Sequence, residues 1–166
     1  VLFLMTIILG IDPGLNNTGL GLIDFDGNKL AFIASQTVIN KHSLSTSEKL
    51  KNLNEQLNLF ISKHATNEVA IEETFVNVNP LTSLSLGQAR GAIILTIVLN
   101  NLPIFEYSST KIKKSVTSSG RASKEQISSM IKFFLPKAVF DSEHSADALA
   151  VAIYHANNSN LRKYVR

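Results

Sequence analysis

A carboxylate at the end of a buried strand is the feature that most restricts how this chain folds. Residues Ile8–Ile11 are apolar or small, and Asp12 follows them directly before Pro13 and Gly14, which turn the backbone. A charge in this place is costly unless a metal ion or backbone amides compensate it. Gly14 and Gly19 would let a phosphate or a nucleic-acid backbone approach the carboxylate. Hydrogen bonding of Asp12 to local amides is the simpler alternative, and this motif alone leaves both open.

The N-terminal part of the chain predicts an antiparallel meander, and the rest alternates between helices and strands. We expect strands at Thr6–Ile11, Gly19–Phe25, Leu30–Ile39, Val69–Glu72 and Pro103–Tyr107. We expect helices from caps within Ser43–Ser47 to His64, from Pro80 to about Asn100, over Lys124–Leu135 and over about Ser142–Asn157. This order predicts an α/β fold. Its five-stranded mixed sheet has three antiparallel strands, then parallel additions, with helices on both faces.

Length and hydropathy fit one soluble domain. The 166 residues are enough for one hydrophobic core. We expect residues 1–166 to form a single domain, with 1–5 as a candidate N-terminal extension and 158–166 as a flexible tail. The longest apolar run, Ala92–Leu99, is far shorter than the roughly 20 residues needed to span a bilayer. We therefore expect a cytoplasmic protein with no membrane contact.

The chain contains no cysteine, which excludes disulfides and thiolate metal sites. Any metal would therefore be held by carboxylates and histidines, a donor set that favours hard cations such as magnesium and manganese. The net charge of +3 and the pI of about 9.2 are compatible with nucleic-acid binding. Both values are too modest to argue for it alone.

Four side chains that could hold metal ions occur where a buried apolar pattern would not place them. Asp12 ends the first strand and Glu72 ends the fourth, while His144 and Asp147 are three residues apart on one face of the last helix. If the first and fourth strands are parallel neighbours, all four converge. Carboxylates forced together repel one another, and divalent cations relieve the repulsion. Two such ions could drive phosphodiester hydrolysis; the alternative is a set of unrelated polar core residues.

A basic, hydroxyl-rich stretch follows the fifth predicted strand. Ser108–Ser123 is expected to be helical at first and then looped. The cations in and just after it are Lys111, Lys113, Lys114, Arg121 and Lys124. Beside a metal site they predict phosphate contacts, although a charge run is more simply a solvated surface. Phe75, on the loop after Glu72, either plugs the core or stacks on bases.

The helix that begins at Pro80 is apolar nearly all round between Ala92 and Leu99, so more than one of its sides needs cover. Gly87 and Gly91 are four residues apart and would let another helix approach closely. Burial in the core and a dimer interface explain this pattern equally well.

Four motifs, in order along the chain, resemble the RuvC family of bacterial Holliday-junction resolvases. They are Ile8–Gly14, Ala70–Phe75, Leu86–Gly91 and Ser145–Ala150, and the resemblance covers nearly the whole chain. It implies a ribonuclease H-like fold, a homodimer, and metal-dependent, symmetrical nicking of four-way DNA junctions in recombination and repair. It also implies partnership with the RuvA–RuvB branch-migration complex.

The resemblance, together with the acidic site and the basic stretch described above, gives the expected site residues and cofactors. The expected catalytic and metal-binding residues are Asp12, Glu72, His144 and Asp147. The expected DNA-binding residues are Phe75, Lys113, Arg121 and Lys124. Magnesium is the expected cofactor, with two ions per subunit. Many family members have aspartate where this chain has His144, and because imidazole is an adequate manganese ligand, we expect manganese to support activity as well.

Three other functions stay open from the sequence. The Asp12 motif followed by Thr18 and Gly19 also resembles the phosphate loop of actin-like ATPases, although those proteins need two such domains around a nucleotide. A non-catalytic junction-binding module would treat His144 as a mark of lost chemistry. A related nuclease acting on RNA or on other branched substrates would use the same acidic site.

Overall fold

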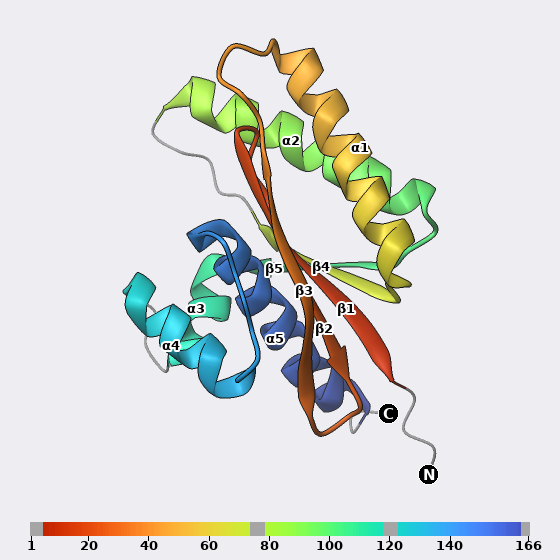
Figure 1. Ribbon diagram of the computed structural model, residues 1–166, viewed down its shortest axis with the longest axis vertical. Coiled ribbons are helices and arrows are strands. Elements are labelled where there is room, and N and C mark those ends of the chain that lie inside the picture. Colours follow the sequence, from red (N-terminus) through yellow and green to blue (C-terminus); the bar gives the residue numbers. More distant parts are fainter. Residues whose placement is uncertain (1–4, 74–78, 118–122, 164–166) are drawn as a thin grey trace.

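The computed structural model describes residues 5–73, 79–117 and 123–163, and it shows one mixed sheet between two layers of helices (Figure 1). The strands are β1 (Thr6–Asp12), β2 (Asn17–Phe25), β3 (Leu30–Ile39), β4 (Glu68–Glu73) and β5 (Ile104–Ser108). The helices are α1 (Thr46–His64), α2 (Pro80–Leu99), α3 (Ser109–Thr117), α4 (Lys124–Phe134) and α5 (Glu143–Lys163). The predicted α/β class and all five strands are confirmed.

The strand order is β3-β2-β1-β4-β5. β1, β2 and β3 pair antiparallel, whereas β4 is parallel to β1 and β5 is parallel to β4. Ile11 is the register partner of Ile71. Asp12 and Glu72, the next residue along each strand, therefore lie at the same edge of the sheet. The parallel pairing that the acidic motifs required is therefore present.

Each face of the sheet has its own apolar core. α1 and α2 cover one face, and α3, α4 and α5 cover the other (Figure 1). Successive side chains of a strand point to opposite faces, so Leu9 and Ile11 pack towards α1 and α2, while Ile8 packs towards α5. The same alternation places Asp12 on the α5 face of β1.

Local capping explains where several helices begin. Ser45 caps α1: its side chain accepts from the backbone N–H of Glu48, whose carboxylate accepts from the backbone N–H of Ser45. Asn79 caps α2 directly before Pro80, a favourable first helical residue because it lacks the N–H that would go unpaired. The caps within Ser43–Ser47 and Pro80 are the signals from which these helix starts were predicted, whereas the cap at Asn79 was not predicted.

The last helix differs from its predicted length. α5 continues to Lys163, six residues beyond the expected end at Asn157, so residues 158–163 are helical where a tail was expected. Asn158 Nδ2 donates to the Tyr154 carbonyl at 2.8 Å, and Ser159 Oγ donates to the Ala156 carbonyl at 2.8 Å. Carbonyls of the same helix satisfy the donors of both side chains, so these polar residues do not require the helix to end before them.

The apolar character of α2 has a partial explanation in the structure. Ala89, Ile93 and Ile97 are fully buried against the sheet and α1, whereas much of the opposite side of the helix is exposed. By length and composition alone, α2 would pass as a candidate membrane span. One such helix is weak grounds for a membrane protein, because core helices have the same composition.

Candidate active site

A patch of glycines on the sheet seats α5. Gly10, Gly19 and Gly21, the glycine patch, lie on β1 and β2 beneath α5. A Cβ at Gly19 would overlap the carbonyl oxygen of His144, and one at Gly10 would overlap the carbonyl oxygen of Ala148. The helix backbone therefore rests directly on the strands, as only glycine permits. This corrects the expectation that Gly19 admits a phosphate: it admits the first turn of α5.

The role expected for Gly14 is likewise local. A Cβ at Gly14 would overlap the carbonyl oxygen of Asn17, within the turn between β1 and β2. The hydroxyl of Thr18, which is almost fully buried, donates to the carbonyl of Gly14 in the same turn. Gly14 thus shapes the tight turn that follows Asp12.

The close packing of α5 on the glycine patch places His144 next to Asp12. His144 Nδ1 lies 2.8 Å from Asp12 Oδ2, across 132 residues of sequence. The Asp12 side chain is 18% exposed and that of His144 is 43% exposed, so the pair lies at the rim of the core and faces solvent. The bond to Asp12 raises the pKa of His144 above its usual range, against the opposing effect of burial. Asp12 therefore binds a side chain from α5 rather than only local amides.

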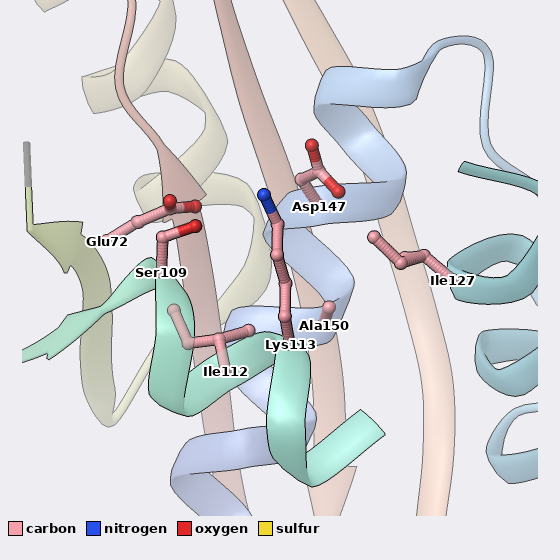
Figure 2. Close-up of a pocket in the computed structure, with 7 residues that line it drawn as sticks. All are labelled: Glu72, Ser109, Ile112, Lys113, Ile127, Asp147 and Ala150. Carbon is pink, nitrogen blue, oxygen red and sulfur yellow. The ribbon is translucent and has the colours of Figure 1, made fainter. Parts of the chain in front are cut away.

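Glu72 and Asp147 line a single pocket beside this pair (Figure 2). α3 contributes Ser109 and Lys113 to its wall, and the ammonium of Lys113 rises between the two carboxylates. The remaining lining residues are Ile112, Ile127 and Ala150. Since side chains alternate along β4, Glu73 faces the other side of the sheet, as expected.

Both pocket carboxylates bind protons more tightly than usual. Burial, with the charge of Asp12 as the next largest cause, raises the pKa of Asp147 to about 6. Burial also raises the pKa of Glu72, and the nearby charges of Asp12 and Asp147 add to the shift. Lys113 opposes the shift at both residues. At both residues, burial and the neighbouring carboxylates outweigh the opposing charge of Lys113.

The residues present fit a hard divalent cation by their chemistry. Three part-buried carboxylates and an imidazole offer oxygen and nitrogen ligands, and an adjacent cation would reverse the raised pKa values of Glu72 and Asp147. Among the residues that the structure describes (5–73, 79–117 and 123–163), no three histidine, aspartate or glutamate side chains are close enough together in their present positions to hold one metal ion. The four expected residues thus gather at one edge without forming a closed metal cage.

The predicted DNA-binding residues are placed only in part. Lys124 begins α4 and forms an ion pair with Glu143, which directly precedes His144, and both side chains are exposed. Lys111 and Lys114 are exposed on α3. Phe75 and Arg121 lie outside the described residues.

Two side chains of α3 line the wall of this pocket. Lys113, which the sequence places in a basic run beside the acidic site, is half-buried among the acids. Ser109, which hydrogen-bonds Glu72, was not singled out at all. The signal was available: Ser109 and Lys113 are four apart on a helix that starts where β5 ends, beside β4.

Comparison with known proteins decides the family. Residues 8–155 match the family model described as crossover junction endodeoxyribonuclease RuvC. The chain belongs to the RuvC family. The RuvC of Xanthobacter autotrophicus is 46% identical over 151 residues, which cover 91% of this chain and 89% of that protein. The RuvC of Afipia carboxidovorans is 46% identical over 159 residues, covering 96% and 93%.

Solved structures agree with this membership. RuvC of Thermus thermophilus, in complex with a Holliday junction substrate, matches with a TM-score of 0.87 and 25% identity over 95% of this chain and 96% of that one. The yeast mitochondrial Holliday junction resolvase Ydc2 matches with a TM-score of 0.69 at 12% identity, covering 99% and 85%, and shows likeness of fold alone. The ribonuclease H-like fold expected of a RuvC protein is confirmed.

Proposed function

We propose that this chain is a structure-specific endonuclease that resolves four-way DNA junctions by paired, symmetrical nicks. The observation that carries the proposal is the meeting of Asp12, Glu72, His144 and Asp147 at one sheet edge in a RuvC chain. The proposal also draws on its relatives, which are named crossover junction endodeoxyribonucleases. Its context is homologous recombination and DNA repair.

The direct test is cleavage of a labelled four-way DNA junction beside linear duplex of the same sequence, with magnesium or manganese. Paired nicks in opposed strands of the junction alone are the expected result. Tight junction binding without cleavage under either metal would instead support a non-catalytic binding module. Cleavage of branched RNA in preference to the DNA junction would support the related nuclease.

In the proposed mechanism, Asp12, Glu72, His144 and Asp147 would hold divalent cations, two per subunit. Bound there, the cations would supply positive charge at the scissile phosphate and lower the pKa of a water molecule. The carboxylates of Asp12, Glu72 and Asp147 have fixed positions, since each lies on a strand or helix of the core, and they would therefore fix the positions of the cations. His144 holds a proton at Nδ1 towards Asp12, which keeps the ring oriented. The expected products carry 5′-phosphate and 3′-hydroxyl ends.

The choice of metal follows from the imidazole at position 144. Replacing a carboxylate by His144 lowers the negative charge of the site and adds a nitrogen ligand, which suits manganese better than magnesium. We therefore expect manganese to support junction cleavage at least as well as magnesium. Initial rates over a concentration series of each metal measure this. Clearly higher activity with magnesium throughout would contradict it.

We propose that DNA is held by Phe75, Lys113, Arg121 and Lys124. Lys124→Ala should weaken junction binding severalfold and reduce the slope of log affinity against log salt concentration by about one, since one phosphate contact is lost. Binding titrations between low and physiological salt measure this slope. Lys51→Ala is the matched control, because Lys51 is an exposed lysine that also pairs with a glutamate, Glu55, but on α1. An unchanged slope in Lys124→Ala would remove this lysine from the phosphate contacts.

A homodimer is proposed from the outer face of α2. Leu84, Leu95 and Val98 are each more than half exposed, and a Cβ at Gly87 or Gly91 would meet no atom of this chain within 4 Å. These five residues recur at helical spacing and form one stripe, which we name the α2 stripe. A second copy could lay the same stripe across it at the glycines, and the two-fold axis would match that of the junction. Partnership with RuvA–RuvB is proposed from family membership alone.

Leu95→Glu should shift the protein from dimer to monomer at micromolar concentration, because it buries a charge in the α2 stripe. Sedimentation equilibrium or light scattering after size exclusion measures the mass. Phe133→Glu is the control, since it adds the same charge at an exposed apolar residue on the opposite side of the sheet. A dimer that persists in Leu95→Glu would place the interface elsewhere.

A further inference from the structure

Three hydrogen-bonded polar side chains, which we name the His155 triad, join α5 to both parallel strands; two of them, His155 and Tyr107, are buried, and the third, Glu68, is part-exposed. His155 on α5 is 1% exposed, and its Nδ1 lies 2.7 Å from the hydroxyl of Tyr107 on β5. Its Nε2 lies 2.7 Å from Oε2 of Glu68 on β4. None of these residues is among the proposed metal ligands or DNA contacts.

The hydrogen bonds fix the direction of donation. A carboxylate only accepts, so Nε2 of His155 carries the proton given to Glu68. In the neutral ring Nδ1 is then the acceptor, and the hydroxyl of Tyr107 donates to it. Both ring nitrogens are thus satisfied inside the core, and removal of one partner would leave a buried polar group unpaired. The ring also packs on Phe105, with centroids 4.5 Å apart, which further restricts its orientation.

Each residue of the His155 triad either lies on the same helix or strand as a pocket carboxylate or is its register partner in the sheet. Glu68 and Glu72 are four residues apart on β4, so they point to the same face. Tyr107 is the register partner of Glu72 in the β4–β5 ladder. His155 follows Asp147 by eight residues on α5, about 12 Å along the helix axis.

Apart from the hydrogen bond between His144 and Asp12 at its first turn, the other contacts of α5 define its position along the sheet less sharply. Its buried face is made of alanine, leucine, valine and isoleucine that pack on apolar strands and on the glycine patch. Apolar packing is non-directional, whereas two hydrogen bonds of 2.7 Å tolerate little sliding. A shift of α5 that breaks these bonds would also move Asp147 relative to Glu72.

We infer that His155 is a positioning residue: bonded to Tyr107 and Glu68, it holds α5 at the setting along β4 and β5 that places Asp147 opposite Glu72. The inference rests on the proposed nuclease function. It assigns His155 no contact with DNA, metal or the reacting phosphate. Its effect is on the geometry of the carboxylates that bind the metal.

Three variants each remove one of the two hydrogen bonds: Tyr107→Phe and His155→Gln remove the bond between Tyr107 and His155, and His155→Asn removes the bond to Glu68. Tyr107→Phe removes only the hydroxyl and keeps the ring that packs on Tyr154. His155→Gln retains a donor near Nε2 for Glu68, whereas His155→Asn retains an acceptor near Nδ1 for Tyr107. Tyr154→Phe is the matched control, because it removes a tyrosine hydroxyl on α5 that is not part of the His155 triad.

We expect Tyr107→Phe and His155→Gln to raise the manganese concentration for half-maximal junction cleavage by about ten- to a hundredfold, as for other residues that orient metal ligands. Manganese binding without DNA, followed by electron paramagnetic resonance, should weaken by the same factor. Junction binding without metal should stay within about twofold of wild type. His155→Asn, which keeps the bond to Tyr107, should retain more metal affinity than His155→Gln. All measurements are made well below the melting temperature of each variant.

Two failures are distinguishable. If wild type does not cleave the junction, the proposed function fails. Suppose instead that wild type cleaves, and that Tyr107→Phe and His155→Gln lower only the melting temperature, with metal affinity and cleavage equal to those of Tyr154→Phe. The His155 triad then contributes only to stability, and the inference is overturned.

Discussion

Asp12→Asn should reduce junction cleavage by at least about 10³-fold, because in the proposed mechanism this carboxylate would hold a metal ion and contribute several kcal/mol, and each 1.4 kcal/mol is a factor of ten. Asparagine has nearly the same shape, and its carbonyl oxygen can still accept from His144 Nδ1, so the first turn of α5 keeps its contact. Junction affinity should therefore stay close to that of wild type. Single-turnover cleavage and binding of the same labelled junction measure the two effects separately.

The control for removing one negative charge is Asp26→Asn. Asp26 lies in the β2–β3 hairpin, at the other end of the strands from Asp12, where it accepts from the backbone N–H groups of Asn28 and Lys29. Asparagine can accept the same bonds, so this variant should cleave normally. Loss of junction binding in Asp12→Asn, with Asp26→Asn unaffected, would give Asp12 a folding or binding role instead of a catalytic one.

Gly19→Ala should destabilise the protein by about 3 kcal/mol, at the upper end for overpacking a core. The added Cβ would overlap the carbonyl oxygen of His144 and reach 3.0 Å from the backbone nitrogen of Ser145, so the start of α5 must lift from the sheet. Because that turn carries His144, cleavage should fall even where the variant remains folded. Urea denaturation gives the stability, and cleavage at low temperature gives the activity of the folded fraction.

Gly87→Ala is the control for adding one methyl group to glycine. A Cβ there meets no atom of this chain within 4 Å, so monomer stability, read at low protomer concentration, should not fall. Alanine even favours the helix by about 1 kcal/mol over glycine. If Gly19→Ala were as stable and active as wild type, the close seat of α5 on the sheet would not be required.

The fold was largely accessible from local patterns. Alternating apolar residues in β1 to β3 and the hairpin signal at Asp26 and Gly27 describe the meander, and the cap at Ser45 and the proline at position 80, Pro80, mark two helix starts. These features depend on neighbours within a few residues, so a linear reading captures them. The end of α5 was placed too early, because Asn158 and Ser159 bond to the helix instead of leaving it.

The site was accessible in its acids and less so in its surroundings. A carboxylate at the end of an apolar strand is unusual enough to notice, so Asp12 and Glu72 stood out, as did Asp147 on an apolar helix. Lys113 was predicted only as a DNA contact and not as a neighbour of the carboxylates, because a lysine within a basic run has the same sequence signature whether it faces solvent or a pocket of acids. His155 did not stand out, since its partners lie 48 and 87 residues away.

The linear order of residues was enough to establish the family, the strand and helix types, and which carboxylates break an apolar pattern, because each depends on residue identity and short spacing. Only the folded chain decided what those residues face. Gly19 receives a helix turn where a phosphate was expected, Asp12 binds His144, and Lys113 stands between Glu72 and Asp147. The physical reason is that these neighbours come from elements far apart in the sequence. They become neighbours only because α5 and α3 pack on the sheet.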